Sequence, residues 1–158
     1  MEQMTAIHYR PATPEDWDTI AQHFHDLWRD NGVPETGIRP DWQALTLDFI
    51  QTATATLDYQ AFVAEVQGEI VGSVGGQRFA GLYPNALMPE QRCYGYLWNV
   101  YVVATYRRQG MGRALTQRAV AYLKSLGCTR IILHASPFGQ PLYEQMGFQP
   151  SNEMRLDL

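Results

Sequence analysis

The stretch from residue 99 to residue 115 constrains the fold more than any other part of the sequence. It begins with an apolar run that contains Val100 and Val102 and is rich in β-branched residues, which is typical of a buried strand. It continues through a basic turn holding Gly110 and Gly112 into a segment whose apolar residues recur at helical spacing. The sequence therefore predicts a strand that passes through a glycine turn directly into a helix.

This turn has the features of an anion-binding site. The first backbone N–H groups of a helix have no partner within the helix and lie at its positive end, so they attract phosphate. Gly110 and Gly112 leave room for a bulky pyrophosphate beside the main chain, and three arginines add positive charge. These arginines are Arg107, Arg108 and Arg113. The turn predicts a site for a phosphorylated ligand.

Three kinds of phosphate-binding loop can be compared with this turn. The loop of nucleotide hydrolases ends in Gly-Lys-Ser/Thr, which the chain does not contain. The dinucleotide loop needs Gly-x-Gly-x-x-Gly, and Leu115 stands where the third glycine is required. A third pattern, Arg/Gln-x-x-Gly-x-Gly/Ala after a strand, is matched by Arg107, Gly110 and Gly112.

A second motif lies further along the chain, where residues 142–148 read Leu-Tyr-Glu-Gln-Met-Gly-Phe. Together, and in this order, the two motifs resemble those of the GNAT (GCN5-related N-acetyltransferase) superfamily, whose signature loop holds the pyrophosphate of acetyl-coenzyme A. The resemblance extends over essentially the whole chain. It implies an α/β fold with a central twisted mixed sheet of roughly six to seven strands flanked by about four helices. In that fold the fourth and fifth strands splay apart to admit the cofactor.

The residue pattern predicts elements that agree with this fold. Strands are expected at residues 6–10, 61–67, 70–77, 94–103, 130–135 and, as one or two strands, 148–158. Helices are expected at residues 14–30, 41–51, 111–126 and, as a short helix, 137–147. Residues 52–59 are compatible with either a frayed helix end or a loop.

The resemblance also implies which residues hold the cofactor and which act on it. Main-chain N–H groups of the turn would bind the pyrophosphate, and the main chain of Val100 and Val102 would pair with the pantetheine arm as an added strand does. The N–H near Val100 would stabilise the oxyanion, and Tyr143 would protonate the leaving thiolate. The residues expected to bind acetyl-coenzyme A are Val100, Tyr101, Val102, Arg107, Arg108, Gln109, Gly110, Met111, Gly112, Arg113 and Ser136.

Two positions depart from the family pattern. Ser136 stands where many members carry an asparagine; a serine there can still bind the pantetheine arm or cap a helix. Asn99 stands near the place of a glutamate that serves as base or holds water, and a neutral amide cannot act as a base. An ordered water, His134 or Glu153 is left as a candidate base.

The acceptor site is expected on the face built by the first two helices and by the loops at residues 33–40 and 79–92. The candidate acceptor contacts are Trp28, Tyr83, Trp98 and Asn99. We expect the acceptor to be a primary amine of a small molecule rather than of a protein. The alternative is a non-catalytic sensor or regulatory module that binds acyl-coenzyme A without transferring the acyl group.

The remaining expectations concern the chain as a whole. Its 158 residues fit one domain, residues 1–158, and the net charge of −4 argues against a general nucleic-acid binder. Cys93 and Cys128 match no metal motif, so no metal is expected. The N-terminal Met1-Glu2-Gln3-Met4 is polar and no apolar run is long enough to span a bilayer, which predicts a cytoplasmic protein without membrane contact. The resemblance also allows a homodimer.

Overall fold

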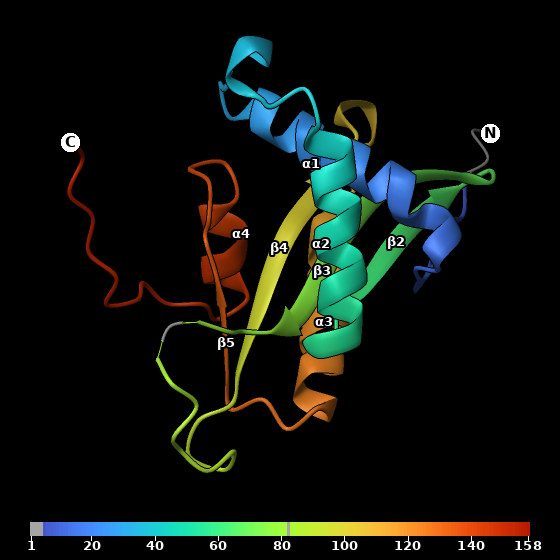
Figure 1. Cartoon of the computed structure of the whole chain (residues 1–158). Helices are drawn as coiled ribbons and strands as arrows, with labels where there is room; N and C mark the ends of the chain where they lie inside the picture. Colours follow the sequence, from blue (N-terminus) through green and yellow to red (C-terminus); the bar gives the residue numbers. More distant parts are fainter. Residues whose placement is uncertain (1–4, 82) are drawn as a thin grey trace.

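The structure of the chain, a computed structural model, describes residues 5–81 and 83–158, so the polar N-terminal residues 1–4 lie outside the described part. The strands are β1 (Ile7–Pro11), β2 (Gln60–Val66), β3 (Glu69–Arg78), β4 (Tyr94–Val102) and β5 (Arg130–Leu133). The helices are α1 (Trp17–Asp30), α2 (Trp42–Thr56), α3 (Met111–Ser125) and α4 (Gln140–Gln145), with short 3₁₀ turns η1 (Pro14–Asp16), η2 (Glu35–Gly37) and η3 (Ala104–Tyr106). The strands form one sheet in the order β1-β2-β3-β4-β5; the first four are antiparallel neighbours, and β5 is parallel to β4 (Figure 1).

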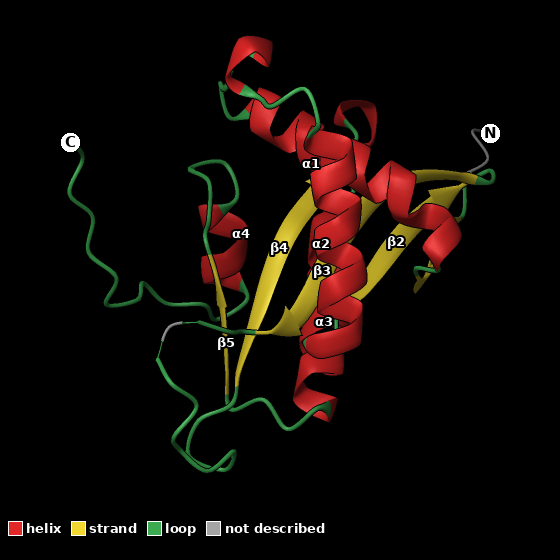
Figure 2. Cartoon of the chain, viewed as in Figure 1, coloured by secondary structure: helices red, strands yellow, loops and turns green. Residues whose placement is uncertain are grey.

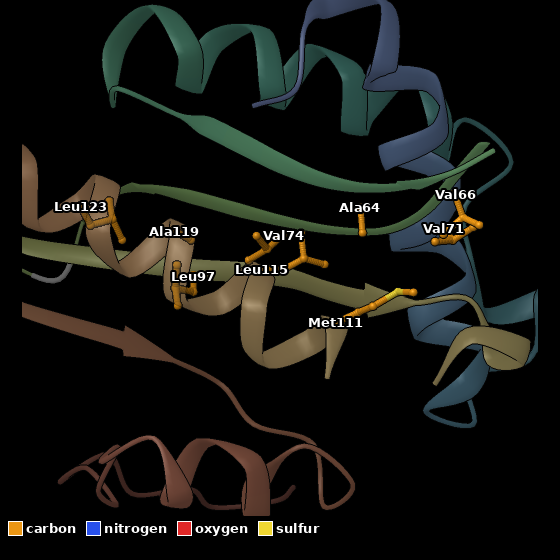
Figure 3. Close-up of a cluster of buried hydrophobic side chains, with 9 residues drawn as sticks. All are labelled: Ala64, Val66, Val71, Val74, Leu97, Met111, Leu115, Ala119 and Leu123. Carbon is orange, nitrogen blue, oxygen red and sulfur yellow. The ribbon is translucent and has the colours of Figure 1, made fainter. Parts of the chain in front are cut away.

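Helices cover both faces of this sheet, with α1 and α2 on one face and α3 on the other (Figure 2). The α3 face is closed by Leu115, Ala119 and Leu123, all of which are fully buried against the strands. Figure 3 shows these side chains with Ala64, Val66, Val71, Val74, Leu97 and Met111. The α1/α2 face has its own cluster, formed by Ile20, Ile50, Ala53, Tyr59, Ala61 and Val63. The predicted mixed α/β architecture is confirmed.

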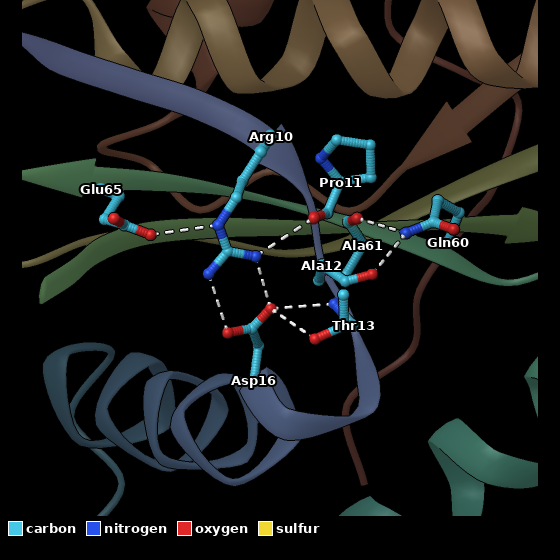
Figure 4. A network of polar contacts seen from close by, with 8 residues as sticks. All are labelled: Arg10, Pro11, Ala12, Thr13, Asp16, Gln60, Ala61 and Glu65. Atoms are coloured by element: carbon cyan, nitrogen blue, oxygen red, sulfur yellow. Dashed lines mark hydrogen bonds and ion pairs between the residues drawn. The ribbon is translucent and has the colours of Figure 1, made fainter. Parts of the chain in front are cut away.

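A charged network fixes the start of α1 against the first two strands (Figure 4). The guanidinium of Arg10 on β1 donates to both carboxylate oxygens of Asp16, over 2.7 and 3.0 Å, and its Nε donates to Glu65 on β2 over 3.0 Å. Asp16 also accepts the backbone N–H of Thr13 over 2.8 Å. Arg10 and these hydrogen bonds lower the pKa of Asp16. The network sets the direction in which α1 crosses the sheet.

Helix α2 continues past residue 51 through the threonine- and alanine-rich run to Thr56, so of the two alternatives for this run the helix end is the one observed. The threonine hydroxyls donate to main-chain carbonyls one turn earlier: Thr54 to Ile50 over 2.7 Å and Thr56 to Thr52 over 2.8 Å. These bonds satisfy the hydroxyls within the helix. Ala53 packs in the core, and that tertiary contact extends the helix beyond residue 51.

The prediction of one or two strands at residues 148–158 is wrong, and the described residues form five strands rather than six to seven. Met154, Leu156 and Leu158 alternate with polar residues as in a strand, yet all three are exposed. The C-terminal segment runs away from the sheet in Figure 1 and pairs with no strand. Alternation indicates a strand only where a neighbouring sheet edge receives it.

Candidate active site

The site begins where β4 and β5 separate. Their parallel pairing runs from Tyr94↔Arg130 to Leu97↔Leu133 and ends there, although β4 continues to Val102. Figure 1 shows the two strands diverging toward their carboxyl ends, with α4 beside β5. Beyond Leu97, that edge of β4 has no strand partner among the described residues. An edge of this kind offers main-chain N–H and C=O groups to a ligand.

A bulge in β4 lies at this open edge. Asn99 has φ +56°, in the left-handed region, and the β3–β4 register shifts between Ser73, opposite Tyr101, and Gly75, opposite Trp98. One extra residue in β4 therefore lets two consecutive side chains, those of Trp98 and Asn99, point to the α1/α2 face. After the bulge, Val100 and Val102 pack on the α3 face.

Buried polar groups hold the bulge against α1. The Asn99 side-chain amide donates to the Ile20 carbonyl over 3.0 Å, and its Oδ1 has no partner among the described residues. Beneath it, His23 Nδ1 lies 2.8 Å from the Ser73 hydroxyl, and its ring packs 5.0 Å from that of Tyr101. Burial lowers the pKa of His23 to about 4, so the imidazole is neutral at neutral pH.

The glycine turn after β4 presents main-chain N–H groups. Arg108 and Gly110 have φ values of +62° and +81°, so the chain reverses sharply before α3 begins at Met111. The first N–H of the helix to donate is that of Ala114, to the Gly110 carbonyl over 3.1 Å. In the described part of the chain no acceptor receives the N–H groups from Gly110 to Arg113. These free donors at the positive end of a helix fit the oxygens of a pyrophosphate.

The arginines of the turn differ in their surroundings. Arg107 Nη2 contacts Asp30 at the end of α1 over 2.6 Å, and its Nε donates to the Val102 carbonyl over 2.7 Å. Arg107 thus ties the turn to both α1 and β4. Arg113 lies near the Gln145 side chain of α4, at 3.4 Å, and Arg108 is exposed. A direct contact of these guanidinium groups with the cofactor stays a prediction.

Helix α4 carries the predicted general acid. The Tyr143 ring packs edge-on against Phe148, with centroids 5.7 Å apart, and lies against Gly139, where an added Cβ would be 3.0 Å from it. Burial raises the pKa of Tyr143 from 10 to about 12, which favours the protonated phenol over the phenolate. Ser136 accepts the backbone N–H of Gly139 over 3.2 Å and so orders the start of α4. The binding role of Ser136 and the catalytic role of Tyr143 stay predictions.

Four aromatic rings on the α1/α2 face form what we call the aromatic wall: Phe24, Trp28, Phe49 and Trp98. Phe24 packs edge-on against Trp28 and Trp98, and Phe49 packs edge-on against Trp98. Trp28 and Phe49 are about half exposed. A pocket of about 420 Å³ between α1 and α2 adjoins this wall at Phe24 and Trp28. The structure therefore connects the predicted acceptor contacts Trp28 and Trp98 through Phe24.

Tyr83, by contrast, does not share this wall. It lies on the long loop between β3 and β4, 67% exposed, and the guanidinium of Arg92 covers its ring at 4.7 Å. Figure 1 shows that this loop extends from the end of the sheet away from the one that α1 crosses. The arrangement does not support an acceptor contact at Tyr83, which stays a prediction.

Sequence reasoning did not identify two polar contacts of the site. His23 and Ser73 lie fifty positions apart along the chain, and Tyr96 and His134 meet across β4 and the end of β5. No local motif marks such pairs, since the register of the sheet brings them together. His134 and Ser136 also line a cleft of about 470 Å³ with Asp30 of α1 and Phe138.

The described residues, 5–81 and 83–158, contain neither a membrane-spanning helix nor a metal-binding cluster. None of their helices has the length and hydropathy that a bilayer crossing requires. The same residues contain no cluster of three or more His, Cys, Asp or Glu side chains arranged to hold a metal ion.

Comparison with known proteins gives consistent matches. The curated relatives include a glucosamine 6-phosphate N-acetyltransferase from Trypanosoma brucei brucei, 38% identical over 42% of this chain and 46% of that protein. They also include an N-alpha-acetyltransferase from Sulfurisphaera tokodaii, 30% identical over 62% of each chain. The matched segments thus span about half the length of these relatives.

Solved structures match over nearly the full chain. A GCN5-related N-acetyltransferase from Ralstonia eutropha JMP134 superposes with a TM-score of 0.82 at 29% identity, over 97% of this chain and 99% of that one. An acetyltransferase from Clostridium acetobutylicum with acetyl-CoA gives 0.77 at 26% identity, over 97% and 96%. The acetyltransferase (GNAT) family model matches residues 14–148. With the glycine turn, the β4 bulge and the splayed strands, these matches show that the chain belongs to the acetyltransferase (GNAT) family.

Proposed function

We propose that this protein transfers the acetyl group of acetyl-coenzyme A to a primary amine of a small molecule. The observation that carries this proposal is the joint placement of the free N–H groups at Gly110–Arg113 and the unpaired edge of β4 beyond Leu97. The first fits a pyrophosphate, and the second fits the amide groups of a pantetheine arm. The edge of β4 lies where β4 and β5 separate, and the start of α3 lies near α4, since Gly112 adjoins Leu142 and Arg113 adjoins Gln145.

The chain supplies groups for each part of such a transfer. An amine attacks the thioester carbon, so a C–N bond forms and the C–S bond breaks. In this proposal the main-chain N–H near Val100, in the part of β4 beyond the β5 pairing, donates to the oxygen that gains negative charge. In this proposal Tyr143, a protonated phenol whose pKa burial raises to about 12, supplies the proton that the thiolate takes up.

Cavity size and one of the relatives support a small acceptor. The cleft beside His134 and the pocket between α1 and α2 are open hollows of about 470 and 420 Å³, within the size range of small-molecule sites. One relative is named for glucosamine 6-phosphate, a small amine. The aromatic wall beside the bulge offers an apolar contact surface for an acceptor.

Two measurements on the whole protein test the proposal. Calorimetry with coenzyme A should show binding that weakens with salt, and release of free thiol from acetyl-coenzyme A should depend on added amine. Tyr143→Phe should lower kcat by roughly 10²-fold while leaving coenzyme A affinity unchanged. Tyr9→Phe on β1, far from the cleft, is the matched control and should retain full activity.

Three results contradict the proposal in different ways. Absence of coenzyme A binding would refute the assignment of the glycine turn as a pyrophosphate site. Binding without amine-dependent thiol release over a broad panel of amines would favour the sensor alternative. An unchanged kcat for Tyr143→Phe would refute only the assignment of Tyr143 as the general acid.

A further inference from the structure

Three side chains from separate parts of the chain form a continuous hydrogen-bonded series beside the cleft. The Tyr96 hydroxyl on β4 lies 3.0 Å from Nδ1 of His134, which follows β5. The other ring nitrogen, Nε2, lies 3.0 Å from the Glu153 carboxylate in the C-terminal segment. The rings of Tyr96 and His134 meet edge-on with centroids 5.8 Å apart, which fixes their relative orientation.

The chemistry of the partners assigns the protons. A carboxylate only accepts hydrogen bonds, so Nε2 of His134 carries hydrogen and donates to Glu153. In the neutral form of the ring, Nδ1 is then the lone-pair nitrogen and accepts the Tyr96 hydroxyl proton. A neutral imidazole aligned by a carboxylate and facing a hydroxyl is the arrangement that prepares a hydroxyl to exchange protons. Burial and the charge of Glu153 raise the pKa of Tyr96, so the phenol is protonated at rest.

The series adjoins the surface proposed for the acceptor. Tyr96 precedes Trp98 by two positions on the same face of β4, immediately before the pairing with β5 ends at Leu97. Phe79 packs edge-on against the Tyr96 ring, at 5.6 Å between centroids, and brings no charge. His134 lines the cleft with Asp30, whose carboxylate is paired with Arg107. Glu153 is therefore the only carboxylate among the described residues that hydrogen-bonds to this tyrosine–histidine pair.

We propose that Tyr96, His134 and Glu153 form the proton relay that deprotonates the acceptor amine. This inference rests on the function proposed above and supplies the base that Asn99 cannot be. In the step, the amine nitrogen bonds to the thioester carbon and gives one proton to the Tyr96 oxygen. Tyr96 simultaneously gives its own proton to His134 Nδ1, so the phenol is unchanged.

The product of this step is an imidazolium paired with the Glu153 carboxylate. The His134 side chain is 61% exposed, so the imidazolium can return its proton to water and restore the neutral ring. In this relay Tyr96 is the catalytic residue, since the proposed step has its oxygen take the amine proton directly. His134 accepts the proton through Tyr96, and Glu153 is a positioning residue that orients the ring.

The first test compares Tyr96→Phe with Tyr94→Phe. Tyr94 lies on the same face of β4 two positions earlier, and its hydroxyl contacts Arg130, outside the relay. Rates of amine-dependent thiol release are measured from about pH 6.5 to about pH 10, because a general base contributes roughly 10²-fold or more. Tyr96→Phe should lose about that factor at neutral pH and recover toward alkaline pH, where free amine and hydroxide replace the base. Tyr94→Phe should follow the wild-type profile.

The second test uses His134→Ala. The exposed position leaves room for imidazole from solution, which should restore the lost activity in His134→Ala and leave Tyr96→Phe unaffected. Glu153→Gln should lower kcat less than His134→Ala does. Circular dichroism and coenzyme A calorimetry on each variant confirm that the fold and the cofactor site are intact.

The outcomes separate the relay from the function itself. If the wild type acetylates amines while Tyr96→Phe and His134→Ala both stay within twofold of its rate, the relay is refuted and the proposed function stands. An activity loss in Tyr96→Phe that is equal at every pH, without rescue of His134→Ala by imidazole, shows a structural role and also refutes the relay. A wild-type protein that binds coenzyme A and acetylates no amine overturns the proposed function and the relay with it.

Discussion

The buried histidine beneath the β4 bulge makes a prediction about stability and pH. His23 is 4% exposed, and its Nδ1 lies 2.8 Å from the Ser73 hydroxyl. Burial lowers its pKa from 6.5 to about 4, and the nearby charge of Asp26 offsets only part of that effect. Because the folded-state pKa is the lower one, the unfolded chain binds the extra proton first as pH falls. Stability from this residue is therefore complete above pH 6.5 and declines between 6.5 and 4.

The size of the effect follows from the two pKa values. Between about pH 7.5 and about pH 5, the difference in proton uptake at His23 should remove about 2 kcal/mol from the free energy of unfolding. The measurement is urea unfolding of the wild type and of His23→Gln at both pH values. The wild type should lose about 2 kcal/mol more than the variant. His25, whose pKa is raised by Glu35, is present in both proteins and cancels.

The quantity that decides is the change in the free energy of unfolding between the two pH values, compared between the wild type and His23→Gln. His23→Gln lowers stability at every pH through altered packing, so its absolute stability carries no information about titration. Equal pH dependence in wild type and variant would show that His23 titrates alike in the folded and unfolded chain. The account of a neutral, buried imidazole under the bulge would then be wrong.

Three other substitutions have expected outcomes that thermal or urea unfolding can check. Gly75→Ala places a Cβ 2.8 Å from the ring of the buried Tyr59, and overpacking of this kind should cost about 1–3 kcal/mol; no loss would mean that Tyr59 moves freely. Leu115→Ala leaves a cavity at a fully buried position of α3 and should lower the free energy of unfolding by about 2–5 kcal/mol. A loss below about 1 kcal/mol would indicate that the core collapses into the cavity. Asp30→Asn removes the partner of Arg107, and because both side chains are nearly half exposed the cost should stay below about 1 kcal/mol. A larger loss would indicate a pair shielded from solvent.

Local patterns in the sequence predicted the helices and strands whose positions depend on residues close together along the chain. The start of α3 at Met111, directly after the glycine turn, follows from a strand pattern, two glycines and a helical pattern within seventeen residues. The same reasoning placed β4 and β5, and each of these elements depends on neighbours along the chain rather than on distant contacts. The separation of their carboxyl ends was implied by the resemblance to the GNAT fold and not by any local pattern.

Features set by distant contacts could not be predicted in this way. The bulge at Asn99 exists because β3 and β4 pair in two registers, and one strand alone carries no sign of that shift. The relay partners Tyr96, His134 and Glu153 are separated by 38 and 19 positions. The alternation at Met154–Leu158 predicted a strand that finds no partner in this structure. Register and the presence of a neighbour are properties of the whole sheet.

The early end of the β4–β5 pairing has a consequence for how such a chain can change over time. What the separated edge exposes is peptide backbone, which every amino acid except proline possesses in full. Mutation can therefore replace the side chains along this part of β4 extensively while the row of donors and acceptors persists. A binding surface formed by main-chain groups therefore tolerates sequence changes that would destroy one formed by side chains. This holds as long as no proline is introduced and the two strands remain separated.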